Sequence, residues 1–314
     1  MFSKIILALI LVILVGFFLF FSIGKNEYPK ELNDSGIQAT QKFQLEEDFS
    51  DLIQNFISFE FNNEKKLEYK LESDSFTTYI DSPGMMINPI VTHYDVKSGK
   101  KIYVLTSDFG WLLKSGDFLF SGSVDVESKN GEKHLMKSNS FLLKRKLGEI
   151  VSNDSVKYFG VDNEMISNGI RIKPEQDFFE TIGATEIISN NGEKILSENV
   201  NIDKTKLKNI YSSKSPTKYI SPSEEVQAQG FNYDQNTTIM NLFGRSKIIQ
   251  NNGTVIDSKT LKVKDKNNQK DKVYETSKEI LYQSNNLKVN GIGMIFDSES
   301  DIIKLKQNVE AVYE

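Results

Sequence analysis

The sequence repeats one turn at a fixed interval, and this repeat constrains the fold more than any other feature of the chain. The stretches IISNNGEKILS (187–197) and IIQNNGTVIDS (248–258) match at seven of eleven positions. Glycines recur at the same interval in the turns (Gly131, Gly192 and Gly253) and inside the preceding strands (Gly122, Gly183 and Gly244). A fixed period, here about 61 residues, indicates similar units stacked side by side.

Around each strand glycine, apolar side chains occupy alternate positions and polar side chains lie between them. Because the side chains of a strand alternate between its two faces, each copy has one mainly apolar face. Stacked copies would join these faces into one strip, so we expect three full units and a truncated fourth, in which Gln307 replaces the glycine. The residues predicted to line the strip are Phe118, Phe120, Val124, Val126, Phe179, Ile187, Met240, Leu242, Ile248, Ile303, Leu305 and Val309.

The chain after residue 57 is typical of short strands separated by Asn, Gly, Asp and Ser. Asn62-Asn63 and Ser98-Gly99 indicate hairpin turns, since Asn and Gly tolerate positive φ. The run KVKDKNNQKDKV (262–273) indicates a solvated loop of mixed charge. The predicted fold is therefore all-β, a half-folded antiparallel sheet that encloses a long apolar interior.

Composition excludes several functional classes. The chain has 314 residues, no cysteine and a formal net charge of −5, so disulfides, thiol catalysis, cysteine-bound metals and a basic nucleic-acid surface are excluded. The two histidines, His93 and His134, stand in unrelated contexts and are interpreted as surface or packing residues. With no recognisable catalytic constellation, the sequence predicts a protein that is not an enzyme and uses no cofactor or metal.

The apolar N-terminal segment predicts a transmembrane helix that anchors the protein and contacts membrane lipids. Residues 5–23 contain no charged side chain and, as a helix, would reach roughly 28 Å, about the thickness of a bilayer core. A cleaved signal peptide is the alternative, but its apolar region is normally shorter and ends in small residues, whereas phenylalanines fill this exit. We expect the N-terminus in the cytoplasm and the bulk of the chain exported. Residues 25–50 are interpreted as a tether, and a short helix over 45–56 is the alternative for its end.

The order of the N-terminal segments resembles a known family. A single apolar helix precedes FEFNNEKKLEYKLESDSFTTY, INPIVTHYDVKSGKKIYVLTSDFGWLL and DFLFSGSVDVES. This order resembles the lipopolysaccharide export protein LptC, whose periplasmic domain is a slotted β-jellyroll (β-taco) related to LptA. The resemblance divides the chain into an anchor (1–24), a linker (25–50), an LptC-like jellyroll (51–195) and additional LptA/LptC-like repeats that continue it (196–314).

The resemblance also implies a function. It implies an inner-membrane, single-pass protein that receives lipopolysaccharide from an ABC transporter with LptF/LptG-like subunits and passes it to an LptA-like periplasmic protein. The twelve strip residues would then contact lipid acyl chains, and the C-terminal strand, about 302–313, would be the edge that pairs with a partner. Lys304 and Lys306 allow the opposite reading of that strand, as charges that discourage pairing.

Two alternatives stay open from the residues alone. The apolar strip is equally the pattern of a closed structural core, because most buried apolar residues are core residues. The chain would then be a membrane-tethered β-solenoid scaffold of the envelope that binds protein partners and no lipid.

Overall fold

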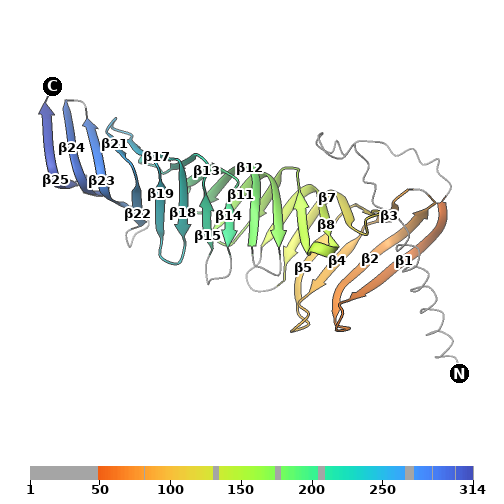
Figure 1. The fold of residues 1–314 in the computed structure, drawn as a ribbon. Helices are drawn as coiled ribbons and strands as arrows, with labels where there is room; N and C mark the ends of the chain where they lie inside the picture. Colours follow the sequence, from red (N-terminus) through yellow and green to blue (C-terminus); the bar gives the residue numbers. More distant parts are fainter. Residues whose placement is uncertain are drawn as a thin grey trace.

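The computed structural model describes residues 49–80, 82–129, 134–173, 178–203, 209–265, 272–284, 286–300 and 302–313. These residues form one antiparallel sheet of 25 strands and one short 3-10 helix, Arg145–Leu147 (Figure 1). The prediction of an all-β antiparallel fold is confirmed. The predicted anchor and nearly all of the linker lie outside the described residues, as does Gly131. In the part that is described, no helix has the length and apolar character needed to cross a membrane.

Nine strands of ten to thirteen residues run through the full width of the sheet. They are β1 (Phe49–Phe61), β2 (Leu67–Tyr79), β7 (Phe118–Ser128), β8 (Leu135–Lys144), β11 (Asn163–Lys173), β12 (Phe178–Ser189), β23 (Lys272–Ser284), β24 (Leu287–Asp297) and β25 (Ile302–Tyr313). Sixteen shorter strands pair with only one half of this width. The sheet is therefore divided lengthwise into two walls.

Wall 1 consists of one half of each long strand and eight short strands. The short strands are β4 (Ile90–Tyr94), β5 (Lys101–Thr106), β10 (Val156–Phe159), β13 (Lys194–Glu198), β16 (Thr217–Ile220), β17 (Glu224–Ala228), β20 (Ser246–Gln250) and β21 (Val255–Ser258). Each pairs with its neighbours in sequence along the wall, from β2 to β23.

Wall 2 consists of the other halves and eight further strands. These are β3 (Gly84–Ile87), β6 (Phe109–Leu112), β9 (Glu149–Ser152), β14 (Asn201–Asp203), β15 (Ile210–Ser213), β18 (Gly230–Asp234), β19 (Ile239–Phe243) and β22 (Leu261–Asp265). They too pair in order along the length of the molecule. The two walls meet along one closed side, the corner, and their outer ends border an open side, the mouth.

The repeated strand glycines lie at the corner. Gly122, Gly183 and Gly244 have φ values of 71°, 70° and 70°, in the left-handed region that favours glycine. At the first of them β7 changes partner from β6 to β5, so one continuous strand belongs to both walls. In β25 the equivalent bend is at Asn308, with φ 49°, immediately after the Gln307 that the repeat had indicated. Asparagine tolerates this conformation better than most residues do.

Hydroxyl side chains line the inside of the corner. Ser73, Ser107 and Ser167 each donate a hydrogen bond to the carbonyl two positions ahead, at 3.1, 2.8 and 2.8 Å. These bonds satisfy carbonyl groups where the strand bends away from its ladder partner. The corner is therefore built by glycine conformations together with local hydroxyl bonds.

Three local predictions can be compared with the structure. The hairpins β1–β2 and β4–β5 are present, and the turn glycines Gly192 and Gly253 have positive φ, so these predictions are confirmed. The short helix over 45–56 is wrong for its described part, because residues 49–56 belong to β1 and pair with β2. The solvated loop over 262–273 is wrong at both ends, because Leu261–Asp265 forms β22 and β23 begins at Lys272.

Candidate functional site

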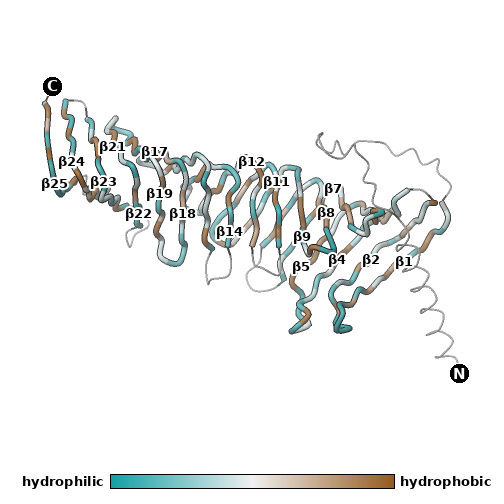
Figure 2. Tube along the Cα trace, in the orientation of Figure 1, coloured by the Kyte–Doolittle hydropathy of each residue, from teal (hydrophilic) through white to brown (hydrophobic). Residues whose placement is uncertain are grey.

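The interior between the two walls holds most of the residues that the repeat predicted as an apolar strip. Eight of the twelve are buried in one continuous cluster: Phe120, Val124, Val126, Phe179, Ile187, Met240, Leu242 and Ile248. Phe118, Ile303 and Leu305 are partly buried and pack against that cluster. Val309, on the terminal strand β25, is 55% exposed. Figure 2 shows apolar and polar residues alternating along the strands, as the repeat requires.

The strip is divided between the walls, which the sequence did not predict. Phe120 pairs with Gly110 and Phe141 in wall 2, whereas Val126 of the same strand pairs with Leu105 in wall 1. The inner faces of the walls then pack on each other, as in the contact of Tyr158 with Phe179, whose ring centroids are 5.6 Å apart. The interior is thus an apolar layer closed by contact between the walls.

A polar aromatic stack interrupts the interior near its first strands. His93 of β4 is only 2% exposed and lies between Tyr69 and Tyr103, at ring-centroid distances of 4.5 and 5.0 Å. Burial lowers the pKa of His93 to about 4, and nearby Asp95 offsets part of that shift. The imidazole is therefore neutral at physiological pH, in agreement with a packing role.

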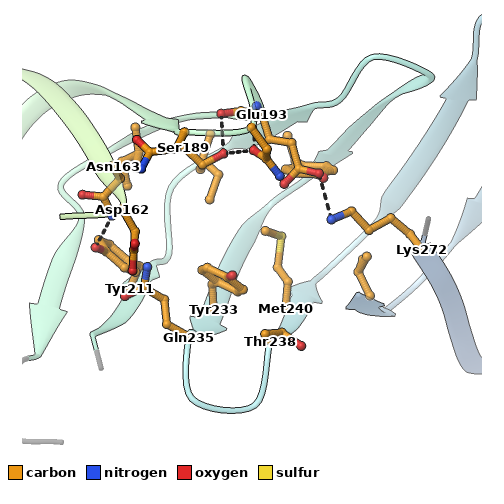
Figure 3. Close-up of a pocket in the computed structure, with 16 residues that line it drawn as sticks. Asp162, Asn163, Ser189, Glu193, Tyr211, Tyr233, Gln235, Thr238, Met240 and Lys272 are labelled. Carbon is orange, nitrogen blue, oxygen red and sulfur yellow. Dashed lines mark hydrogen bonds and ion pairs between the residues drawn. The ribbon is translucent and has the colours of Figure 1, made fainter. Parts of the chain in front are cut away.

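The mouth contains a cavity of about 280 Å³ between the outer ends of the walls (Figure 3). Its floor is apolar and aromatic, and its rim is polar. The floor is formed by Ile187, Ile195, Tyr219, Tyr233, Met240 and Val263. The rim is formed by Asp162, Asn163, Ser189, Asn190, Asn191, Glu193, Tyr211, Gln235, Thr238 and Lys272. This volume is close to the lower end of ligand pockets, roughly 300 Å³.

Polar contacts join the two walls across this mouth. Asn163 of wall 1 donates a hydrogen bond of 2.6 Å to the Tyr211 hydroxyl of wall 2. The Lys272 ammonium of wall 2 lies 2.8 Å from the Glu193 carboxylate, in the β12–β13 turn of wall 1. Figure 3 shows both contacts at the edge of the cavity. Each contact joins segments that are far apart in the sequence. Polar side-chain contacts therefore hold the two walls together in addition to their apolar packing.

A second carboxylate lies deeper beside Lys272. Glu224 of β17 accepts a hydrogen bond from the Tyr274 hydroxyl of β23. Burial raises the pKa of Glu224, and the Tyr274 hydrogen bond and the Lys272 charge oppose that rise. Burial, followed by the proximity of Glu224, raises the pKa of Tyr274, so this hydroxyl stays protonated as a donor. The Lys272 ammonium also lies 5.9 Å from the centre of the Tyr219 ring, within the range of a cation–π contact.

These contacts follow the repeat of the chain. Glu224 stands one repeat period after Asn163, and Lys272 stands one period after Tyr211. Successive copies therefore place a polar wall 1 residue opposite a polar wall 2 residue at the same step. The sequence pattern did not predict them, because Lys272 stands in a run typical of a solvated loop, whereas its side chain is only 3% exposed. The spacing of the repeat was the signal that could have found them.

A similar contact lies at the first strands of the stack. The Arg145 guanidinium, at the outer end of wall 2, donates a hydrogen bond of 2.9 Å to Glu60 of β1 and lies 5.2 Å from the centre of the Phe118 ring. Polar pairing across the mouth therefore extends over more than one part of the described chain. Such a site, with apolar walls below and polar groups above, suits an amphiphile better than a fully polar molecule.

The ends of the sheet are unequal. On β1, five apolar side chains are more than 40% exposed: Leu52, Ile53, Ile57, Phe59 and Phe61. On β25, the exposed apolar residues are Ile302, Val309, Val312 and Tyr313, and the same strand carries Lys304 and Lys306. Within the described residues both strands pair on one side only, with β2 and β24, so both are open to strand addition.

Comparisons with known proteins give one family. The family described as "Lipopolysaccharide-assembly, LptC-related" matches residues 7–186 and 247–314, more than three quarters of the chain. Among solved structures, a match is the crystal structure of LptH from Pseudomonas aeruginosa, described as the LptA homologous periplasmic component of the lipopolysaccharide transport device. It is 11% identical, with a TM-score of 0.18, over 58% of this chain and 96% of that chain. The comparison with curated proteins gave no match.

Proposed function

Because the chain belongs to the LptC-related family of lipopolysaccharide-assembly proteins, we propose that it is the membrane-anchored periplasmic component of an export bridge. In this role it receives lipopolysaccharide from an inner-membrane ABC transporter with LptF/LptG-like subunits and passes it to an LptA-like protein. Proteins of this family transport lipopolysaccharide and are not enzymes, so the prediction of a non-enzymatic protein is confirmed.

The proposal divides the chain by task. Residues 1–24 anchor it in the inner membrane, with the N-terminus in the cytoplasm, and residues 25–50 tether the sheet. Residues 51–195 are the LptC-like part, and residues 196–314 extend the same two walls by further repeats. The ladder of strands from β12 through β13 and β14 supports this extension, because both walls continue across residue 195 without a break in pairing.

The observation that carries the proposal is the continuous apolar interior between two walls with a polar mouth. Acyl chains in water gain about 0.8 kcal/mol for each CH₂ group that is buried. A groove of this kind binds lipid by shape and apolar area, while a sugar headgroup remains in water at the mouth. The predicted strip, from Phe118 to Val309, would supply the wall surface that the acyl chains contact.

One observation favours a second function. The strip residues between β7 and β20 are buried by contact between the walls themselves, as in a structural core. A membrane-tethered scaffold that binds only proteins would have the same packing. Under the transport proposal the walls must separate as lipid enters, so that contacts between walls are exchanged for contacts with acyl chains.

Photo-crosslinking in the host separates these functions. Benzoylphenylalanine would replace Phe120, Leu242 or Leu305, one at a time, in the full-length chain. The transport proposal expects lipopolysaccharide adducts at all three positions, and a surface position such as Lys157 serves as the control. Adducts to protein alone would refute transport and support the scaffold. Depletion of the protein should also stall lipopolysaccharide at the inner membrane.

A further inference from the structure

The cross-mouth contacts conflict with passage of a large headgroup along a closed mouth. If acyl chains lie between the walls and the sugar lies outside, the connecting part of the lipid must cross the mouth at every step. Asn163–Tyr211 and Glu193–Lys272 occupy that crossing in the structure, one at each side of the cavity. These contacts must therefore open for lipid to pass.

The chemistry of the contacts suits repeated opening. Separating two apolar surfaces exposes them to water at a cost proportional to their area. Separating an ion pair returns both groups to water, which solvates them and recovers much of the lost interaction. Lys272 is also held by the Tyr219 ring and stands near Glu224, so its ammonium has other stabilising neighbours when it leaves Glu193.

The positions of the contacts argue against a chance surface pairing. Their wall 2 members, Tyr211 and Lys272, stand one period apart, as do Asn163 and Glu224 on wall 1, whereas Glu193 lies in the β12–β13 turn. Glu224 and Lys272 are ionisable residues that are nearly inaccessible to water. Ionisable groups are seldom buried in a structural core, where apolar residues of similar size would pack with less desolvation.

We propose that the Glu193–Lys272 and Asn163–Tyr211 contacts are gates that close the mouth over the 280 Å³ cavity and open in turn to let the lipid headgroup pass. The inference rests on the proposed transport function and adds its regulation. In the closed state the gates shield the apolar floor from water. In the open state they admit the part of the lipid that joins headgroup to acyl chains.

The absence of cysteine in the chain makes a direct test possible. Glu193→Cys and Lys272→Cys would be combined in the full-length protein and joined by a reducible bis-thiosulfonate reagent. The matched control joins Glu186→Cys to Lys194→Cys. That ion pair has the same 2.8 Å separation but links β12 to β13 within wall 1. A second gate variant, Asn163→Cys with Tyr211→Cys, keeps the test available if the first variant does not fold.

Lipid entry would be measured with purified lipopolysaccharide and benzoylphenylalanine at Met240, in the cavity, or at Phe120, away from it. With the gate joined, we expect adducts at Met240 to fall by about tenfold or more, because the competent open state is no longer populated. Reduction of the reagent should restore them, and adducts at Phe120 should stay unchanged. The control pair should have no effect at either position.

Each other outcome overturns a specific claim. If mass spectrometry shows that the gate cysteines are joined and the adducts at Met240 are unchanged, the gate is refuted, whereas the transport function is not. An equal loss when the control pair is joined would also refute it, because any stiffening of wall 1 would then suffice. If the protein with no cysteines gives no lipid adduct at either position, the transport function itself fails, and the gate with it.

Discussion

Replacing His93 by phenylalanine should remove a defined pH dependence from the stability of the sheet. His93 is enclosed between Tyr69 and Tyr103, and burial holds its pKa at about 4, against 6.5 for the exposed group. Phenylalanine keeps an aromatic ring in the stack and cannot be protonated. The variant therefore separates the titration of this position from its packing.

The sign follows from proton binding. The folded pKa is lower than the unfolded one, so the unfolded chain binds more protons between pH 6.5 and 4, and the free energy of unfolding falls as pH falls through that window. The full shift corresponds to about 3 kcal/mol, of which about 2 kcal/mol is lost between pH 7 and pH 5. Well below the folded pKa the histidine is protonated in both states, and its contribution no longer changes.

Urea unfolding at several pH values would measure this difference. Trp111 in β6 is the single tryptophan of the chain and lies in the same early part of the sheet, so its fluorescence reports the relevant region. Carboxylates titrate in both proteins, so their contribution cancels when the free energy of unfolding of His93→Phe is compared with that of the wild type. The difference between these two free energies should shift by about 2 kcal/mol from pH 7 to pH 5, in favour of the variant. A pH-independent difference would show that His93 is not buried as a neutral group.

Three further predictions concern the mouth, the corner and the terminal strand. Lys272→Met should lower the free energy of unfolding by about 3 kcal/mol, because Glu193 loses its cation, whereas Lys194→Met at an exposed pair should cost under about 1 kcal/mol. Adding Glu193→Gln to Lys272→Met should recover most of that loss in denaturant titrations; no recovery would contradict the pairing. Gly183→Ala should destabilise by about 1–2 kcal/mol in thermal unfolding because of its positive φ, and Gly183→Asn by less; equal effects would contradict the conformational cause. Val312→Cys on β25 should crosslink to an LptA-like partner and Leu52→Cys on β1 should not; the reverse pattern would place the docking edge at the other end.

The repeat was sufficient to predict the strands, their alternation and most of the interior. Gly122, Gly183 and Gly244, which recur with the repeat, are the positions where the strands bend, because a left-handed conformation favours glycine. The resulting partition into two walls was not predictable from the same pattern. A strand that turns a corner keeps its alternation, so Phe120 and Val126 read as one face although they belong to different walls.

The polar contacts of the mouth were not predicted from the sequence, for a different reason. Polar residues between strands usually indicate loops, and Lys272 stands in a run of charged and amide residues. Its burial depends on Glu193, which lies much earlier in the chain and on the opposite wall. Local pattern carries no information about such a pairing, because it arises only after the sheet has folded on itself. Residues 49–56 illustrate the same limit. The sequence allowed a helix there, but pairing with β2 makes this segment a strand.

The wall 2 members of the mouth contacts, Tyr211 and Lys272, follow the register of the repeat, and this register bears on how such a sheet would open. In stacked repeats each unit interacts mainly with its neighbours, so local changes need not spread through the whole molecule. Asn163–Tyr211 belongs to one step of the repeat, and Lys272, which pairs with Glu193, belongs to the next. Opening one step would break one polar contact and leave the other in place. Lipid could therefore move along the mouth while only the occupied step is open, with the closed steps on either side keeping the apolar interior out of water.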